Sequence, residues 1–462
     1  MDEDQEKTVR VEKEEDGLPV VRPKVAGIDL GSKEHWVCAP RVDGTGREVA
    51  RFGATTPDLE EMAAWLKQRK VESVAMEGTG VYWIAPHEVL EARGLEVLLV
   101  NTRDLARVPG RKKTDRVDSQ WIQRLHSCGL LVGSFRPTEQ ICMLRTLVRN
   151  RGILVAEAGD WLRRMQKSLD QMNVRVHRAV SDLDGETGMA IIEAIVKGER
   201  DAVKLAQLRH PNCRKSPEEF VKQCSGHWRE DHLFSLKQSL EMYQAVQQRL
   251  KAYDQEILRK VEELEREDCH GQQAPKPKNQ NKAEGITRRG EEILRQALYR
   301  MTGVDLTAID AIGVRAVEVV ISEYGTDLSC FPTEDQFVSH ITLAPRKPTS
   351  GGKPVKKKRK RNSASTRVAE VLRMAAQSMQ RSQTALGAYF RRIAQRKDGG
   401  VATFATARKL AQYIYRLLRW GKQYVDIGAA AYERLYQQAR VKRLTEIVRE
   451  LGFEVIPKTA GA

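Results

Sequence analysis

The sequence predicts an α/β domain at its amino-terminal end followed by a largely helical remainder. Short apolar runs alternate with helical periodicity over residues 24–135, the order expected of a sheet layered with helices. A seven-residue apolar repeat over 228–268 predicts one long helix, and helical periodicity returns after residue 290. At ~150 residues per domain, this length and pattern favour about three units.

The α/β domain is expected to contain a strand hairpin, a third strand, a helix, a strand, a helix, a strand and a long helix. Strands are indicated by short β-branched or apolar runs that end at Gly or acidic residues, and helices by apolar residues three and four positions apart. In chain order the expected ranges are 25–32 with 36–39, 47–55, 58–67, 71–76, 84–93, 95–100 and 115–131.

Residues 1–23 are expected to be a disordered acidic tail. They hold eight acidic and four basic side chains and lack apolar periodicity. They do not resemble a signal peptide, and no apolar run in the chain approaches the ~18 residues of a membrane span. The seven cysteines are unevenly spaced, unlike a disulfide framework. These features predict a soluble cytoplasmic protein without a membrane partner.

The repeat over 228–268 predicts a coiled coil at the end of a helical region spanning 136–268. A single helix packed on its own domain is possible, but the narrow stripe with charged flanks favours a partner helix from a second copy, and therefore a dimer or tetramer. The residues that recur every seven positions are Leu236, Tyr243, Leu250, Ile257 and Leu264.

The last third of the chain is expected to hold a linker over 269–290, a helical domain over 291–440 and a tail over 441–462. The linker is indicated by abundant Gln, Asn, Lys, Pro and Gly. In the helical domain, apolar fragments flank Gly313, with Arg315 just after it. This pattern is typical of a helix-hairpin-helix whose backbone N–H groups hold a phosphate, although an ordinary turn fits it equally well.

Positive charge predominates in the chain. The 78 Lys and Arg exceed the 62 Asp and Glu by a formal net charge of +16, which favours a polyanionic partner such as nucleic acid. Taken alone, each basic run is more often a solvated surface. The residues expected to contact phosphate in the two basic stretches are Arg111, Lys112, Lys113 and Arg116, and Lys353, Lys356, Lys357, Lys358, Arg359, Lys360 and Arg361.

Four acids predict a metal site. Asp115 and Asp118 are three positions apart and share one face of the expected helix. Asp29 and Glu77 each end a strand, where α/β sheets bind their ligands. Carboxylates select Mg²⁺ or Mn²⁺, and two such ions ~4 Å apart stabilise both oxygens in a phosphoryl displacement. Each acid alone is more often solvated surface charge, but their combination with the basic flank favours a site.

Two further groups are more ambiguous. His210, Cys213, Cys224 and His227 have the spacing of zinc ligands, but nearby Pro and Gly equally indicate a plain loop. Ser350 precedes two glycines within a strongly basic stretch, where its hydroxyl would be accessible. By its residues alone, it is more often the serine of a flexible loop.

Three segments carry a resemblance to a known family. Residues 27–29, 77–82 and 113–119 read Gly-Ile-Asp, Glu-Gly-Thr-Gly-Val-Tyr and Lys-Thr-Asp-Arg-Val-Asp-Ser. They resemble the DEDD transposases of bacterial insertion sequences, the family numbered one hundred and ten, and the resemblance extends from about residue 25 to about residue 424. It implies a RuvC-like amino-terminal domain of the RNase H fold. The implied acidic tetrad is Asp29, Glu77, Asp115 and Asp118.

The same resemblance implies a transposase or site-specific recombinase. Ser350 matches the serine of a Ser-Gly-Gly-Lys-like motif and would be the nucleophile, leaving a covalent phosphoserine that conserves bond energy for rejoining. A noncoding bridge RNA would pair with donor and target DNA, as in other RNA-guided systems. Such an enzyme would act at the nucleoid of a prokaryote. The acidic start and the stretch 270–282 are less typical of the family, but they contain no expected catalytic residue.

Other functions fit parts of the sequence. The run from Gly27 to Ser32 also resembles the first phosphate loop of actin-like sugar kinases, but no second Asp-Gly-Gly loop completes it. A junction-resolving endonuclease would use the four acids and give Ser350 no role. A non-catalytic nucleic-acid-binding scaffold would leave all four acids unexplained.

Overall fold

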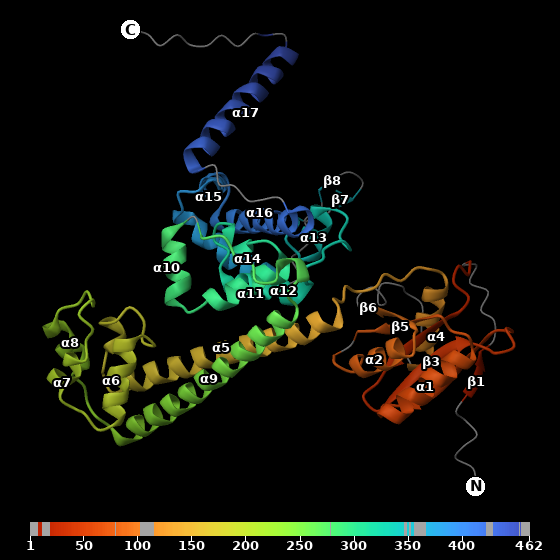
Figure 1. The fold of residues 1–462 in the computed structure, drawn as a ribbon, viewed down its shortest axis with the longest axis horizontal. Helices are drawn as coiled ribbons and strands as arrows, with labels where there is room; N and C mark the ends of the chain where they lie inside the picture. Colours follow the sequence, from red (N-terminus) through yellow and green to blue (C-terminus); the bar gives the residue numbers. More distant parts are fainter. Residues whose placement is uncertain are drawn as a thin grey trace. The chain divides into compact units, whose positions relative to one another are not determined.

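In the computed structural model the chain forms two compact units, Met1–Arg136 and Pro137–Ala462 (Figure 1). The first unit contains the sheet expected over 24–135, and the second contains the helical remainder. The structure describes residues 8–11, 19–78, 80–101, 115–277, 279–345, 349–350, 353–354, 366–421, 428–451 and 453.

The first unit is built on a six-stranded mixed sheet. Three neighbouring strands form an antiparallel meander that includes the predicted hairpin around Asp29, and the next two strands run parallel to the innermost strand of that meander. This arrangement is compatible with an RNase H-like domain. In sheet order the strands are β1 (Thr8–Val11), β4 (Arg47–Gly53), β3 (Glu34–Pro40), β2 (Val25–Leu30), β5 (Ser73–Glu77) and β6 (Glu96–Val100).

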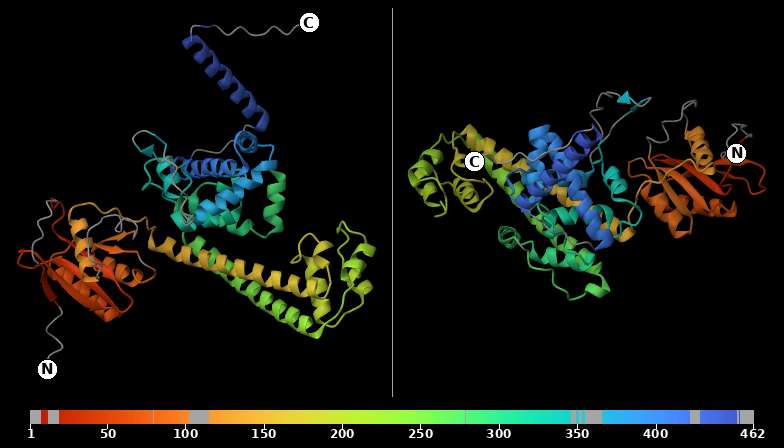
Figure 2. Two further views of the ribbon diagram at one scale, coloured as in Figure 1. Left: turned by 180° about the vertical axis from the view of Figure 1, so that it is seen from behind. Right: turned by 90° about the horizontal axis from the view of Figure 1, so that it is seen from above.

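Helices cover both faces of this sheet (Figures 1 and 2). α1 (Thr56–Gln68) and α2 (Ile84–Ala92) pack against the face that carries Ile28, Val74 and Met76. α4 (Asp115–Ser127) packs on the opposite face through Ile122 and Leu125. Because successive strand residues point to opposite faces, the odd-numbered positions of β2 and β5 lie on the α4 side.

The amino-terminal segment differs from the predicted disordered tail. Thr8–Val11 forms β1 and pairs antiparallel with β4, in register from Thr8↔Ala50 to Val11↔Arg47. Further along, the backbone N–H groups of Val21 and Arg22 both donate to Ser127 O at 2.8 Å. The acidic composition obscured a short Thr-Val-Arg-Val run, in which β-branched residues favour a strand.

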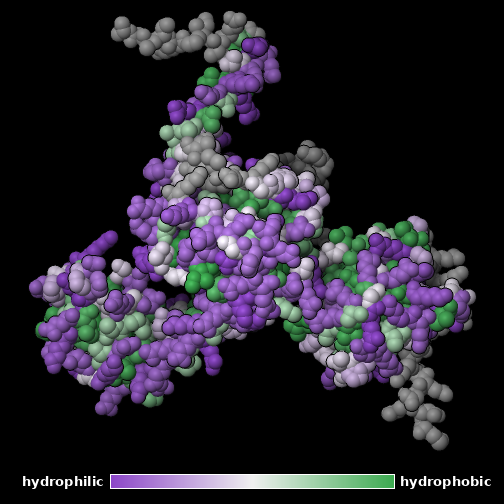
Figure 3. Space-filling model, viewed as in Figure 1, coloured by the Kyte–Doolittle hydropathy of each residue, from purple (hydrophilic) through white to green (hydrophobic). Residues whose placement is uncertain are grey.

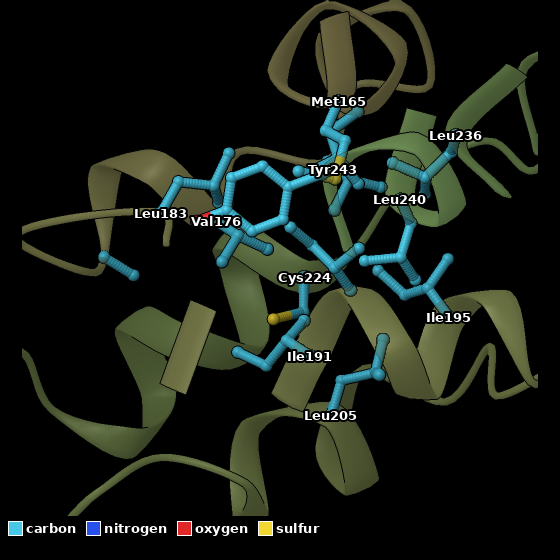
Figure 4. Close-up of a cluster of buried hydrophobic side chains, with 14 of the residues drawn as sticks. Met165, Val176, Leu183, Ile191, Ile195, Leu205, Cys224, Leu236, Leu240 and Tyr243 are labelled. Atoms are coloured by element: carbon cyan, nitrogen blue, oxygen red, sulfur yellow. The ribbon is translucent and has the colours of Figure 1, made fainter. Parts of the chain in front are cut away.

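Two long antiparallel helices, α5 (Glu139–Gln171) and α9 (Glu230–Glu263), dominate the start of the second unit (Figure 1). Leu236, Leu240 and Tyr243 of α9 are buried in the same cluster as Met165 and Leu169 of α5 (Figure 4). The heptad stripe therefore has a partner helix, but the partner is α5 of the same chain. The expectation that this stripe binds a second copy is wrong, because a repeat indicates that a partner exists without indicating which chain supplies it.

Short helices between α5 and α9 contain the proposed zinc ligands. Cys224 is buried among Ile191 and Leu205 in the hydrophobic cluster, where burial raises the pKa of its thiol to about 11 (Figure 4). Cys213 contacts the Thr187 hydroxyl instead. The described side chains, these four included, contain no group of three or more potential metal ligands placed to hold one ion. The helices are η1 (Val176–Arg178), α6 (Glu186–Val196), α7 (Ala202–Gln207) and α8 (Pro217–Cys224).

The linker expected over 269–290 is an ordered part of the second unit. It begins within η2 (Glu267–Cys269) and contains α10 (Gln280–Arg288). Ile286 is fully buried, and the Lys282 ammonium donates to the backbone carbonyls of Thr307 and Ile309. Burial lowers the pKa of Lys282 to about 8. The polar composition suggested a linker, but a few apolar residues and one lysine that bonds distant carbonyls hold the segment in place.

In the described part of the remainder the regular elements are helices, as predicted, together with a short two-stranded hairpin of β7 (Thr349–Ser350) and β8 (Lys353–Pro354). The last helix, α17 (Gly428–Glu450), continues past residue 440, where a tail was expected. No helix in the described part of the chain is both long and apolar enough to cross a membrane. The elements are α11 (Glu292–Thr302), η3 (Leu306–Ala308), α12 (Val314–Tyr324), α13 (Glu334–His340), α14 (Arg367–Ser378), η4 (Met379–Arg381), α15 (Ala385–Arg396), α16 (Gly399–Trp420) and α17 (Gly428–Glu450).

Candidate active site

Asp29 and Glu77 occupy corresponding positions on neighbouring parallel strands. The register of β2 and β5 pairs Ile28 with Met76, so the two acids follow at the next step. Both have odd numbers and lie on the sheet face covered by α4, since side chains alternate along each strand. Adjacent strands lie about 4.8 Å apart, which makes these two carboxylates neighbours at the carboxyl end of the sheet.

Three contacts show that α4 runs antiparallel to β2. Ser127 O accepts hydrogen bonds from Val21 and Arg22, and the Gln123 side-chain amide donates to Val25 O at 3.2 Å. A Cβ at Gly27 would lie 2.6 Å from Ser119 O. As the chain advances through β2, its partners therefore move back toward the amino end of α4.

This crossing places the helical acids at the same edge as the strand acids. From Gly27 to Asp29 the strand advances about 6.6 Å, and four residues of α4 back from Ser119 cover a similar distance of about 6 Å. Asp29 therefore lies beside the first turn of α4. That turn begins at Asp115, and Asp118 is 8% exposed. The close approach depends on Gly27, because any side chain there would meet the backbone of the helix.

The donors at this edge fit a hard divalent cation. Asp29, Glu77 and Asp118 offer only carboxylate oxygens, the ligands preferred by Mg²⁺ and Mn²⁺. The described side chains hold no group of three or more His, Cys, Asp or Glu arranged around a metal position, and the Asp115 side chain lies outside them. The strand register and the helix crossing thus place the backbone positions of these acids at one edge of the sheet.

A buried hydrogen bond joins the end of α4 to the start of β5, at the end of that strand opposite Glu77. His126 Nε2 and Ser73 Oγ are 2.9 Å apart and are both almost completely buried. Burial, with a smaller contribution from Arg22, lowers the pKa of His126 to about 4, so the imidazole is neutral at physiological pH. Sequence reasoning missed this pair, because one Ser and one His 53 positions apart carry no local signal.

The predicted serine lies in the second unit, in the β7–β8 hairpin. Ser350 pairs with Lys353 across the two short strands, so the hydroxyl-bearing residue and a predicted phosphate-binding lysine are backbone neighbours. Their side chains and the intervening glycines lie outside the described residues, as do Arg111 to Lys113 and Lys356 to Arg361. Arg116 is described, in the first turn of α4.

Gly313 and Arg315 form only part of the predicted helix-hairpin-helix. Gly313 precedes α12, but the fragment before it is the short 3₁₀ turn η3, and Ala311 has a φ of +62° between them. Arg315 is paired with the carboxylates of Asp254 at 2.7 Å and Glu318 at 3.1 Å, so a phosphate would have to compete with both. The sequence pattern could not show these long-range ion pairs.

Two family models match the chain. A transposase family model of the DEDD IS110 type matches residues 26–174, and a model of the transposase IS116/IS110/IS902 family matches residues 305–391. No curated protein matches the chain. The first match contains all four predicted acids, and the second contains Gly313, Arg315, Ser350 and Lys353. Together the two matches cover half of the chain, which therefore belongs to the IS110 family of transposases, enzymes that cut and join DNA.

Proposed function

We propose that the chain is the DNA recombinase of an insertion sequence and that its chemistry uses groups from both units. Asp29, Glu77, Asp115 and Asp118 would form the acidic site of the first unit, and Ser350 would supply the nucleophile from the second. The observation that supports the acidic site most strongly is that two strand-end acids occupy corresponding positions beside the amino end of α4.

We propose that the acids hold Mg²⁺ or Mn²⁺, with two ions per site. When bound, these ions would neutralise the phosphate and stabilise the attacking and leaving oxygens. The protein's own contribution would be to hold its carboxylates in place. The register of β2 and β5 sets the separation of Asp29 and Glu77, and the tight crossing at Gly27 sets the position of α4.

The proposed strand cleavage is a displacement at phosphorus. Ser350 Oγ would form a new bond to the phosphorus of a DNA phosphodiester, while the bond from that phosphorus to one deoxyribose oxygen breaks. The serine proton would pass to a carboxylate of the acidic site, and the departing oxygen would take up a proton. The phosphoserine bond conserves the energy of the phosphodiester, so a hydroxyl of another DNA strand could displace the serine and rejoin the strands.

We further propose that a structured noncoding RNA from the element guides the chain to donor and target DNA at the nucleoid. The net charge of +16 supports a nucleic-acid partner. The predicted contacts to phosphate are Arg111, Lys112, Lys113, Arg116, the N–H of Gly313, Arg315, Lys353 and the basic run from Lys356 to Arg361. We also propose a homo-oligomer. Its interface would not be the heptad stripe of α9, because α5 of the same chain covers that stripe.

Covalent trapping tests the proposal. The full chain would be incubated with DNA carrying the joined ends of its element, RNA transcribed from the element's flank, and Mg²⁺. We expect a protein–DNA adduct that resists denaturant and is lost in Ser350→Ala, whereas Thr349→Ala, the matched control, retains it. Full cleavage by Ser350→Ala without any adduct would instead identify a junction endonuclease. Unchanged recombination by Asp29→Ala would favour a non-catalytic scaffold.

A further inference from the structure

The loop between β5, which ends at Glu77, and α2, which begins at Ile84, carries three consecutive apolar or aromatic residues, Val81, Tyr82 and Trp83. Val81 is 69% exposed and Tyr82 is 48% exposed. Figure 3 shows other hydrophobic residues among the hydrophilic ones on the visible surface of this unit. Scattered exposed apolar residues are common, but an apolar run beside a candidate active site suggests a binding role.

Trp83 anchors this loop. Its indole Nε1 donates to Gly80 O at 3.2 Å, and its ring meets the buried His87 edge to face, with centroids 5.7 Å apart. The Arg136 guanidinium lies 5.7 Å from the Trp83 ring centroid and is itself paired with Glu91 at 3.0 Å. The backbone on either side of Tyr82 is therefore tied to α2, and Tyr82 is presented from a fixed base.

The Tyr82 ring lies beside the turn at Gly80. Gly80 has a φ of +57°, a left-handed conformation, and a Cβ at this position would lie 3.8 Å from the ring carbons of Tyr82. The turn supports one edge of the ring, while about half of the side chain stays accessible to solvent. An aromatic ring held in this way loses little conformational entropy when a second ring stacks on it.

We propose that Tyr82 is a stacking platform for a nucleobase next to the DNA phosphate that is cut. The inference rests on the proposed active site. Tyr82 is five residues after Glu77, in the loop that leaves β5 at the edge of the sheet where the acids lie. A DNA strand whose phosphate lies at the acids would place the bases that flank this phosphate near the same edge. Strand exchange also unpairs bases, and a base taken out of its stack needs a new partner surface.

A nucleobase fits this surface better than a partner protein does. The accessible apolar group is narrow, with one phenol ring and the Val81 side chain as its most exposed members, whereas stable protein interfaces bury much larger areas. Aromatic stacking is tolerant of sequence, since every base has a π face. Tyr82 would therefore position the strand without selecting its sequence, and it is a positioning residue.

Photochemical cross-linking tests the contact directly. The full chain would be bound to joined-end DNA in which 5-iododeoxyuridine replaces single thymines on either side of the cut, with the element's flanking RNA present. We expect the cross-link to map to Tyr82 by mass spectrometry, with Tyr82→Phe retaining it and Tyr82→Ala losing it. A cross-link at the flanking bases that maps elsewhere and persists in Tyr82→Ala would overturn the inference.

DNA-binding and cleavage measurements on variants separate a loss of stacking from a loss of the folded structure and from a loss of the cleavage reaction. We expect Tyr82→Ala to bind DNA about tenfold more weakly and Tyr82→Phe to behave like the wild type, because stacking needs the ring and not the hydroxyl. Phe234→Ala, which removes another exposed aromatic, should have no effect. If Tyr82→Ala binds and cleaves DNA like the wild type while Asp118→Asn is inactive, the stacking proposal is refuted and the proposed active site is not. Full cleavage by Asp118→Asn would instead refute the active site on which the platform depends.

Discussion

At Gly27 one missing side chain determines where α4 lies. A Cβ at this position would meet Ser119 O at 2.6 Å and Gln123 Cα at 2.8 Å, and both are rigid parts of the helix. The sequence indicated the strand and the acid near its end, but a glycine in a strand has several possible meanings. The contact partner is a helix more than ninety residues later, which no local pattern identifies.

The Gly27→Ala variant tests this crossing. We expect the free energy of unfolding of the first unit to fall by about 1–3 kcal/mol, because α4 must move off β2, and we expect cleavage to fall with it as Asp118 is displaced. Denaturant unfolding and a cleavage assay measure the two effects. Gly399→Ala is the matched control, since nothing lies within 4 Å of a Cβ there. A fully active and stable Gly27→Ala would contradict the described crossing.

The buried pair of His126 and Ser73 predicts a dependence of stability on pH. Burial lowers the pKa of His126 to about 4, below the ~6.5 of an unfolded chain, so the folded state holds this group neutral. The free energy of unfolding is therefore highest above pH 6.5, where His126 is neutral in both states. It falls by roughly 3 kcal/mol as the pH decreases toward 4. Urea unfolding at a series of pH values measures this loss.

His126→Asn should reduce this acid sensitivity, since the titrating group is gone. His270→Asn, at a histidine side chain that is 84% exposed, should keep the wild-type slope. Equal slopes in the wild type and His126→Asn would show that His126 is not held neutral by burial.

At the scale of elements, the strands and helices of the first unit other than β1 were predictable because their local patterns and their packing agree. The helix predicted over 58–67 is α1, with Leu59, Met62 and Leu66 buried as their spacing requires. Predictions failed where long-range contacts decide the outcome. Lys282 reaches carbonyls 25 and 27 positions away and orders the expected linker, and α5 covers the heptads expected to bind a second copy.

An ion-pair cluster joins the long helices to the carboxyl-terminal helices. Asp254 of α9 accepts from Arg151 of α5 at 2.6 Å and from Arg315 of α12 at 2.7 Å. Asp254 is an acidic residue within the span of the predicted apolar repeat, and the repeat gives it no role. Its partners explain it: the carboxylate connects three helices that lie far apart in the sequence.

Asp254→Ala should lower the free energy of unfolding of the second unit by about 1–3 kcal/mol. The change leaves two partly buried guanidinium groups without this acceptor, and an unmatched charge costs more than a lost surface pair. Urea unfolding followed by circular dichroism measures the effect on the helices. Glu241→Ala removes an exposed pair from the same helix and should change nothing measurable. Equal midpoints for the two variants would show that the cluster does not stabilise the junction.

At the scale of the whole molecule, the proposed chemistry requires the two units to act on one phosphate. The acids belong to the first unit and Ser350 to the second. Sequence reasoning could propose this division, because the family resemblance covers both segments. Whether the serine meets the acids of its own chain or of another copy is a property of the assembled complex with DNA, which local residue patterns do not encode.

The most direct test of the composite centre is to locate the covalent bond to DNA. The trapped adduct would be digested with protease and nuclease, and the modified peptide identified by mass spectrometry. We predict a nucleotide phosphate on Ser350 in the wild type and no adduct in Asp118→Asn. A phosphate attached to another residue, or an undiminished Ser350 adduct in Asp118→Asn, would contradict the proposal that the acids and the serine form one active centre.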